Sequence, residues 1–206
     1  MGHREDLLAG AVACLREKGY ARTTARDIVA ASGTNLASIG YHYGSVEALL
    51  NAAVLAAIEE WGAQLTQSMT AAIDPVAPFP RRFEQYWAAV LGSFEEYRQV
   101  WAASFDLYAV ADHVPEVRDK IAAGLQDGRL AWARLLHGID PETEPAKAQA
   151  VGSLHQALLS GILVQWLTDP DRAPSAHDLL TGLQAIAGDM AGQQAAASAE
   201  PARRHR

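Results

Sequence analysis

The side chains best placed to do chemistry are hydroxyl, amide and imidazole groups on two short helical patterns near the N-terminus. Thr24 and Asp27 have the spacing of a capping box, which predicts the start of a helix. Gly33 supplies a tight turn, and Asn35 is a favourable N-cap for a second helix, Leu36–His42. Two helices around a glycine turn can place the outer side chains of the second in the major groove of duplex DNA. The segment therefore predicts a DNA-reading unit.

Four residues of this segment are candidate phosphate contacts. Tyr41 and His42 can donate hydrogen bonds to phosphate oxygens. Thr24 lies where a helix N-terminus can face an anionic oxygen, and Arg26 adds a cation beside it. The alternative for Tyr41 is packing against the rest of the chain.

Base edges must be read by small side chains, because the second helix has no Arg or Lys for a bidentate contact with guanine. The candidates are Thr34, Asn35, Leu36, Ala37 and Ser38. Leu36 and Ala37 can meet thymine methyl groups, and Ser38 can serve as a permissive hydrogen bonder. Ile39 and Tyr43 are expected to be packing anchors rather than DNA contacts. We expect modest specificity per base.

The first 50 residues resemble the TetR family of bacterial regulators. The resemblance rests on Lys18-Gly19-Tyr20, Thr23-Thr24, Gly33, Tyr41-His42-Tyr43 and the run Ser45-x-Glu47-Ala48-Leu49-Leu50. It implies three N-terminal helices that bind operator DNA, and a larger C-terminal helical domain that dimerises and binds a small effector. It also implies repression relieved by ligand, which is the family's commonest habit.

Three positions depart from the family pattern. Gly40 stands where an aromatic residue is common, Val46 where a Lys usually follows the serine, and Leu36 where the recognition helix usually begins with a polar or basic residue. Each change removes a side chain that contacts phosphate or positions one that does. The changes bear on non-specific affinity more than on the DNA-binding role.

Composition fits a specific regulator rather than a protein that coats nucleic acid. The 206 residues carry a formal net charge of −7, all of it beyond residue 50, since residues 1–50 have five basic and five acidic side chains. An acidic remainder stays off DNA while a few Arg side chains meet phosphate. The single Cys14 excludes an internal disulfide and fits a reducing compartment. With no signal-peptide pattern at the start, a cytoplasmic location is expected.

Helical periodicity continues to near the C-terminus without an alternating strand pattern, so the predicted fold class is all-α. Helices are expected over about 45–70, 81–97, 98–112, 115–135, 146–168 and 176–191. We expect a helix-turn-helix DNA-binding domain over 1–46, an effector-binding and dimerisation domain over 47–192, and a disordered tail over 193–206. The apolar window 148–168 is interrupted by polar residues, which favours a buried helix over a membrane span.

The last two expected helices are the predicted dimer interface. The 146–168 helix is apolar nearly all round and must be covered on every side. Near the end of a chain this small, the cover can be the same two helices of a second copy, which gives an isologous four-helix interface. Gly152 and Gly161 are expected to permit close helix approach there.

The expected effector site draws on the aromatic residues of the 47–192 domain, because aromatic walls with a few polar groups suit an apolar or flat ligand. The candidates are Trp101, Phe105, Tyr108, Trp132, His155 and Trp166. Ordinary core packing is the alternative for each aromatic residue, and a satisfied core or interface histidine is the alternative for His155. Trp101, Phe105 and Tyr108 share one helical face and form the best-supported group.

No pattern for catalysis, a metal or a cofactor is present in the sequence. It lacks a Gly-rich phosphate loop, a nucleophilic serine elbow and paired metal-ligand spacing. The expected partners are double-stranded operator DNA, a small-molecule effector and a second copy of the chain, with no membrane and no enzymatic activity. Two alternatives stay open: a DNA binder that does not respond to ligand, and a helical partner-binding module with a degenerate DNA reader.

Overall fold

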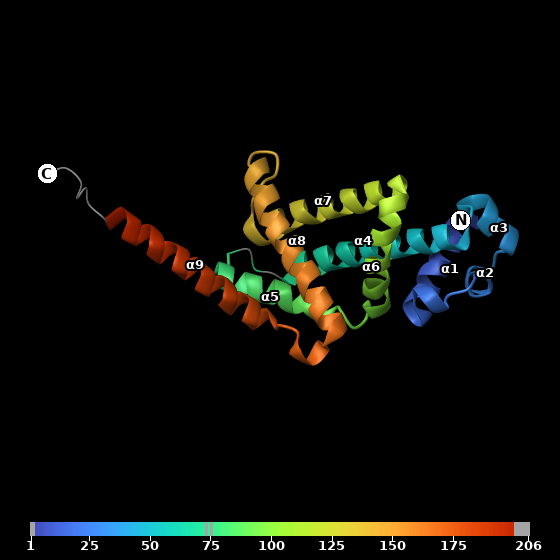
Figure 1. Ribbon diagram of the computed structural model, residues 1–206, viewed down its shortest axis with the longest axis horizontal. Coiled ribbons are helices and arrows are strands. Elements are labelled where there is room, and N and C mark those ends of the chain that lie inside the picture. Colours follow the sequence, from blue (N-terminus) through green and yellow to red (C-terminus); the bar gives the residue numbers. More distant parts are fainter. Residues whose placement is uncertain (1–2, 73, 75, 200–206) are drawn as a thin grey trace.

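The computed structural model describes residues 3–72, 74 and 76–199, and within these ranges the chain forms helices and no strands (Figure 1). The elements are α1 (His3–Lys18), η1 (Tyr20–Arg22), α2 (Ala25–Ser32), α3 (Leu36–Tyr43), α4 (Val46–Ala72), α5 (Phe79–Gly92), α6 (Arg98–His113), α7 (Pro115–His137), α8 (Pro145–Thr168), η2 (Pro170–Arg172) and α9 (Ala176–Ala199). The all-α prediction is confirmed. We call α1–α3 the head and α5–α9 the body, with α4 between them.

The head forms where the local signals place it. Thr24 caps α2, and the reciprocal hydrogen bonds of a capping box with Asp27 are both present. Gly33 ends α2 in the left-handed conformation at φ 66°, and the Asn35 side chain accepts a hydrogen bond from the backbone N–H of Ser38. The three head helices contact one another, and α1 and α3 also pack against α4. The single Cys14 is buried inside α1, as expected of a small apolar residue.

Two helix ends differ from the sequence expectation. α5 ends at Gly92 rather than near 97, because the Ser93 hydroxyl donates to Val90 O and accepts from the indole N–H of Trp61, 2.8 Å away. The turn that follows can then bury Phe94 and Tyr97. α9 continues through Ala199, beyond the expected end at 191, since its alanine-rich end has high helix propensity. The rest of the expected disordered tail, 200–206, lies outside the described residues.

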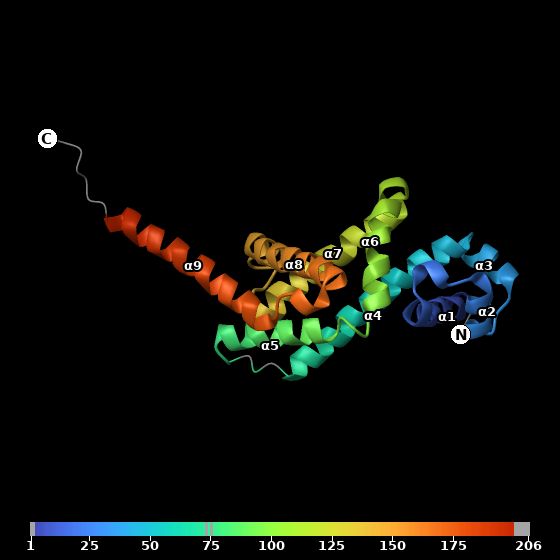
Figure 2. The ribbon, with the colours of Figure 1, turned by 60° about the horizontal axis from the view of Figure 1, so that its bottom comes forward.

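The long helix α4 joins the head to the body. The helix α9 packs along α5 at its beginning and then extends away from the other helices in both ribbon views (Figures 1 and 2). One face of α4 is buried along its whole length, from Leu49 near the head to Leu65 and Met69 in the body. Side-chain hydrogen bonds also connect the head to α4. The Tyr20 hydroxyl donates to Asn51 at 2.8 Å, and Arg16 pairs with Glu60 at 3.0 Å.

α7 and α8 form the most extensive helix pair of the body, and they cross at Gly152. A Cβ at this position would collide with the backbone of Arg129 on α7. The expectation that Gly152 permits approach between subunits is therefore wrong, because the glycine is required by packing within the chain. Gly161 is exposed, and a Cβ there would meet nothing within 4 Å.

Among the described helices, α8 alone is long and apolar enough to cross a membrane, judged by length and composition only. The same helix packs along α7 and carries the buried residues Gly152, His155 and Leu159 on its inner face. These contacts are those of a helix in the body of a helical protein.

Candidate DNA interface and aromatic interior

The start of α2 is held by charge as well as by its cap. The Asp27 carboxylate accepts hydrogen bonds from Lys18 Nζ at 2.6 Å, from the Thr24 hydroxyl at 2.7 Å and from the Thr24 N–H at 2.9 Å. These bonds, that of Lys18 first, lower the pKa of Asp27 to about 2. The Thr24 hydroxyl is thus committed to Asp27, so Thr24 can serve a phosphate through the helix N-terminus that it fixes. Arg26, exposed in the first turn of α2, is available to solvent.

In the turn between α2 and α3, the polar side chains already make local hydrogen bonds. Asn35 Oδ1 accepts from Ser38 N at 3.0 Å, which leaves its amide NH₂ as the free donor. The Thr34 hydroxyl lies 2.8 Å from the Ser32 hydroxyl and is half-buried. Of these two candidates, the exposed Asn35 is the better placed for a base edge.

The outer face of α3 is apolar and open. Leu36 is 54% exposed and Tyr41 is 86% exposed, whereas Ile39 between them is buried against the core of the head. Ala37 and Gly40 are also exposed, and a Cβ at Gly40 would meet nothing within 4 Å. A face of this shape can approach the floor of a groove closely and has no side chain for guanine.

Ser38 and His42 are half-buried at the edge of this face. The His42 ring makes an edge contact with Tyr41, with ring centres 4.8 Å apart. Tyr43 packs against the core, and its hydroxyl donates to the backbone oxygen of Arg4 at 2.8 Å. The Arg4 guanidinium lies over the Tyr43 ring at 5.3 Å, which brings a cation to the end of α3.

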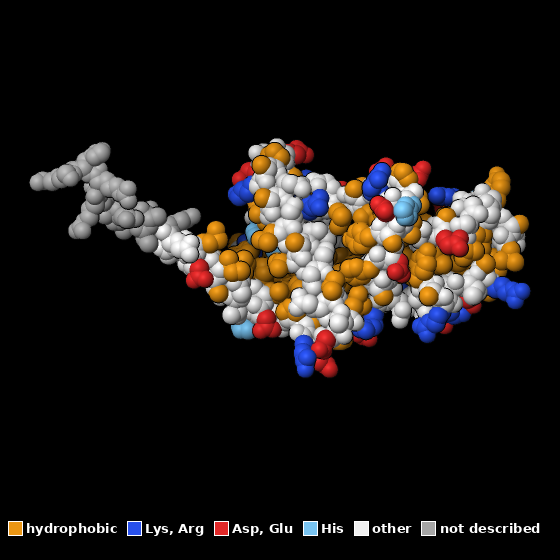
Figure 3. Space-filling model, in the orientation of Figure 1, with side chains coloured by type: hydrophobic (Ala, Val, Ile, Leu, Met, Phe, Trp, Pro, Cys, Tyr) orange, Lys and Arg blue, Asp and Glu red, His pale blue; other side chains and the backbone are white. Residues whose placement is uncertain are grey.

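The sequence did not indicate that Arg4 lies beside the end of α3, because Arg4 stands at the start of α1 and has no periodic relation to α3. The structure otherwise brings all nine predicted DNA contacts to the α2 start, the turn and α3. In the space-filling view, Lys and Arg side chains lie around the margin of the head (Figure 3).

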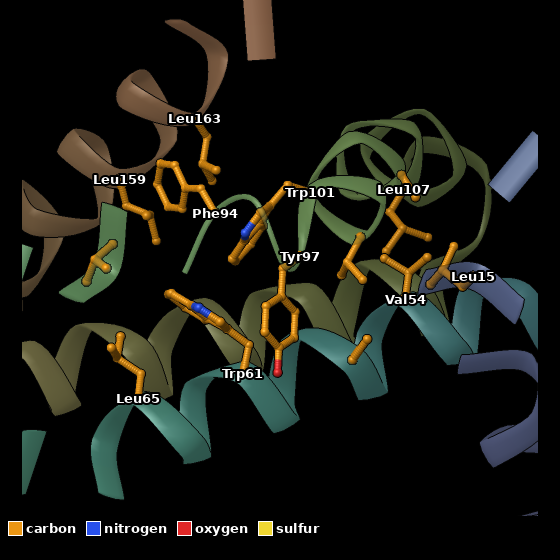
Figure 4. Packing of buried hydrophobic residues seen from close by; sticks show 14 of the residues in the cluster. Leu15, Val54, Trp61, Leu65, Phe94, Tyr97, Trp101, Leu107, Leu159 and Leu163 are labelled. Atoms are coloured by element: carbon orange, nitrogen blue, oxygen red, sulfur yellow. The ribbon is translucent and has the colours of Figure 1, made fainter. Parts of the chain in front are cut away.

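The predicted effector residues fall into separate groups inside the body. Trp101 packs edge-on against Trp61 of α4, with ring centres 4.8 Å apart, and both lie near Phe94 and Leu163 (Figure 4). Trp166 also contacts Phe94, at 5.4 Å, but it is half-buried and its outer face is covered by a guanidinium. This first group joins α4, α6 and α8.

The second group joins α5, α7 and α8. The rings of Trp132 and His155 are parallel within 2° and 5.1 Å apart, and Trp87 stacks on Trp132 at 5.2 Å. His155 Nε2 lies 2.8 Å from His137 Nε2, so one imidazole donates to the other. Burial, and then the neighbouring His137, lower the pKa of His155 to about 4. Both rings are therefore neutral near pH 7, since burial also lowers the pKa of His137.

Phe105 and Tyr108 do not join either group. Their rings contact each other at 6.3 Å, but Phe105 is half-buried and Tyr108 is 49% exposed. Trp101 is buried at the start of α6, Phe105 packs partly buried against the same hydrophobic core, and Tyr108 is about half exposed, so a common wall of the three stays a prediction. Trp61 was missed, since its spacing fits the ordinary buried stripe of α4.

Two surface hollows lie elsewhere. One, of about 190 Å³, lies between η1 and α6 and includes Lys18, Gly19 and Gln99 in its lining. The other, of about 430 Å³, lies between α1 and α4 and includes Leu8 and Val12. Neither is lined by any of the six predicted effector residues. Of these residues, Trp101, Trp132 and His155 are at most 4% exposed.

Comparison with known proteins decides the family. Residues 7–53 match the family described as bacterial regulatory proteins of the tetR family, and residues 78–186 match the tetracyclin repressor-like C-terminal domain. The chain belongs to the TetR family. It is thus a regulator of the TetR type, with an N-terminal helix-turn-helix and a helical C-terminal domain. Among curated proteins, none matches the chain in sequence.

Solved structures show the same fold over nearly the whole length. SCO7518 from Streptomyces coelicolor A3(2) is 22% identical with a TM-score of 0.62, and the match covers 89% of this chain and 97% of that one. SCO1917, a TetR-family member from Streptomyces coelicolor A3, is 22% identical at 0.59, covering 89% and 98%. The multidrug binding protein EbrR, in complex with proflavin, is 23% identical at 0.60, covering 88% and 99%.

Proposed function

We propose that this TetR-family chain is a homodimeric repressor that binds a near-palindromic operator and is released by a small, apolar or aromatic effector. Residues 1–46 form the DNA-binding domain, and residues 47–192 form the domain for effector binding and dimerisation. The protein acts in the cytoplasm. The observation that carries the proposal is the outer face of α3. Its side chains Leu36 and Tyr41 are exposed while Ile39 anchors the helix, as a groove-reading helix requires.

DNA contacts divide into positioning and reading groups. Arg26, Tyr41 and His42 meet phosphates, together with the N-terminus of α2 that Thr24 caps. Asn35, Leu36, Ala37 and Ser38 meet base edges, with Thr34 supporting the turn. Because Leu36 and Ala37 are apolar and exposed, thymine methyl groups are one feature that α3 reads in each half-site, beside the hydrogen bonds of Asn35 and Ser38.

Dimerisation through α8 and α9 is supported by apolar side chains that the single chain leaves uncovered. Leu154 and Val164 on α8, and Ile186 and Met190 on α9, are each about half exposed or more. A two-fold axis at these helices pairs identical faces. The same axis would set the two α3 helices one DNA turn apart, roughly 34–36 Å, on a palindromic site.

Effector control acts through α4, which contributes both to the head and to the aromatic interior. Asn51 of α4 holds the head through Tyr20, and Trp61 of α4 packs on Trp101. A ligand that prefers one tilt of α4 by about 100-fold, roughly 2.7 kcal/mol, changes operator occupancy substantially.

The test begins with selection of duplexes from a random library by the purified chain, followed by gel shift in low salt. We expect a near-palindromic consensus and a complex that contains two chains. Failure to retain any duplex would leave the helical partner-binding module as the better account. A complex on a site without two-fold symmetry would contradict the proposed symmetric dimer.

A further inference from the structure

The Trp87–Trp132–His155 stack contains two polar atoms that the described part of the chain leaves without a hydrogen-bond partner. They are the indole N–H of Trp87 and Nδ1 of His155. Trp87 is fully buried and His155 is 3% exposed, so neither polar atom can form a hydrogen bond with bulk solvent. A buried polar atom without a partner costs about 1–3 kcal/mol, and most such atoms in native proteins are satisfied. These two atoms therefore point to a ligand.

The rings around them determine the shape of that ligand. Trp132 is parallel to His155 within 2° and lies within 26° of Trp87, so the three planes run in nearly one direction. Phe83 closes one side, at 6.0 Å from His155 and 6.2 Å from Trp87. A flat aromatic molecule inserted parallel to these planes keeps stacking contacts on both faces.

The polar atoms determine its chemistry. An indole N–H only donates, so the ligand must offer an acceptor to Trp87. His155 Nε2 shares a proton with His137 at 2.8 Å, and its Nδ1 is an acceptor or a donor according to the tautomer. A carbonyl or hydroxyl oxygen can accept from the Trp87 indole N–H, whereas a hydrocarbon leaves this donor and His155 Nδ1 unsatisfied.

The charges around the stack disfavour a cation. The buried polar residues of the described chain are Thr23, Asn51 and His155, so no carboxylate is buried among them to balance a cationic ligand. Burial, and then the neighbouring cations Arg82 and Lys147, lower the pKa of His137. A buried cation without a counter-charge is costly.

We propose that the effector of this regulator is an uncharged, planar aromatic compound bearing a carbonyl or hydroxyl oxygen, held in the Trp87–Trp132–His155 stack with that oxygen on the Trp87 indole N–H. Only the role of this ligand as an effector rests on the proposed function. Because the stack is closed to solvent, the ligand enters by parting α5 and α7 and displacing ring contacts.

Three tricyclic probes of similar size separate the alternatives in equilibrium dialysis with the full chain at pH 7.5. 9-Fluorenone carries a carbonyl acceptor, fluorene lacks it, and proflavin is a planar cation. We expect fluorenone to bind about 10-fold tighter than fluorene, the gain of satisfying one buried donor, and proflavin to bind weakest. Equal binding of fluorenone and fluorene, tightest binding of proflavin, or no binding of fluorenone would overturn the proposal.

Two indole variants locate the acceptor. Trp87→Phe keeps a ring and removes the N–H, so the preference for fluorenone over fluorene should fall to about 2-fold or less. Trp101→Phe is the matched control, because its buried N–H also lacks a partner within the described chain but belongs to the neighbouring Trp61 group. A preference lost in Trp101→Phe and kept in Trp87→Phe would refute the assignment to this stack.

The design keeps the two proposals apart. Dialysis contains no DNA, so a chain that prefers fluorenone but forms no operator complex refutes the proposed function and leaves the site standing. If Trp87→Phe fails to fold, as judged by its thermal transition, the comparison of the three probes on the unmodified chain still decides the ligand class.

Discussion

Removing the thymine methyl groups of the operator isolates the contribution of α3. Replacement of thymine by deoxyuridine in a selected half-site leaves base pairing and charge unchanged and deletes only the 5-methyl group. Leu36 is 54% exposed at the start of α3, so more than half of its side chain is available to cover such a methyl. At about 25 cal/mol per Å², or roughly 0.8 kcal/mol for one methyl-sized group, each contacted position should cost about 4-fold in affinity.

The assay is fluorescence anisotropy of labelled duplexes at one fixed salt concentration, since phosphate contacts vary steeply with salt. Thymines are replaced one position at a time, and each duplex is titrated with the unmodified chain and with Leu36→Ala. In Leu36→Ala the deoxyuridine effect should shrink to less than about 2-fold at the position that Leu36 covers, because the two changes remove the same contact. Val76→Ala is the control, as Val76 is exposed but lies between α4 and α5, far along the chain from α3.

Two results would refute the reasoning. If every thymine can be replaced without loss of affinity, the apolar face of α3 does not read methyl groups. If the unmodified chain and Leu36→Ala lose affinity equally at every replaced position, Leu36 is not the side chain in contact.

Three further perturbations test other parts of the molecule. Tyr41→Phe should weaken binding to operator and to scrambled DNA by a similar factor, about 3- to 10-fold. Arg26→Gln should lower the slope of log affinity against log salt concentration by about 1. A loss of affinity confined to one operator sequence would contradict both assignments to phosphate. Ile186→Glu should give monomers in sedimentation velocity while Val76→Glu keeps the dimer, and an unchanged mass for Ile186→Glu would remove α9 from the interface. The pKa of His155 is about 4 in the folded chain, against 6.5 for an ordinary histidine. Between about pH 4 and pH 6.5 the unfolded chain therefore binds a proton that the folded chain does not. The contribution of His155 to the free energy of unfolding is thus fully present above about pH 6.5 and is lost as the pH falls. Urea unfolding at pH 7.5 and 5.0 should therefore differ by about 2 kcal/mol more in the unmodified chain than in His155→Phe, and equal differences would show that His155 is accessible to protons in the folded chain.

The head could be predicted from the sequence because its signals are local. A capping box links Thr24 to Asp27, an N-cap links Asn35 to Ser38, and Gly33 needs only its own backbone freedom. Each pairing is three residues long or shorter, so the spacing along the chain is also the spacing in space. The exposed face of α3 can also be predicted locally, because a buried Ile39 places Ala37 and Tyr41 on the other side of the helix.

The interior of the body could not be predicted in the same way, because its contacts join residues far apart in sequence. The Trp61 indole donates to Ser93, and this one bond helps to end α5 early and to turn Phe94 inward. The parallel stacking of Trp132 and His155 depends on the crossing of α7 and α8, which helical periodicity does not specify. Periodicity identifies an apolar stripe but not its partner, so it placed Trp101 and Phe105 on one face without giving their different degrees of burial.

The polar contacts between the head and the rest of the chain are individually weak, beside the apolar packing of α1 on α4 and α6. The Tyr20–Asn51 hydrogen bond is part-buried, and the Arg16–Glu60 pair is partly exposed, so they contribute roughly 1 kcal/mol and 0–1 kcal/mol. Tyr97 adds a third contact, since its hydroxyl lies 3.3 Å from Arg16 Nη2 and its ring lies under the same guanidinium. Loss of the three together is comparable with the roughly 2.7 kcal/mol that a 100-fold shift requires. Under the proposed function, α4 is the element that couples the aromatic interior to α3, because it packs against α1 and α3 and carries Trp61 in the body.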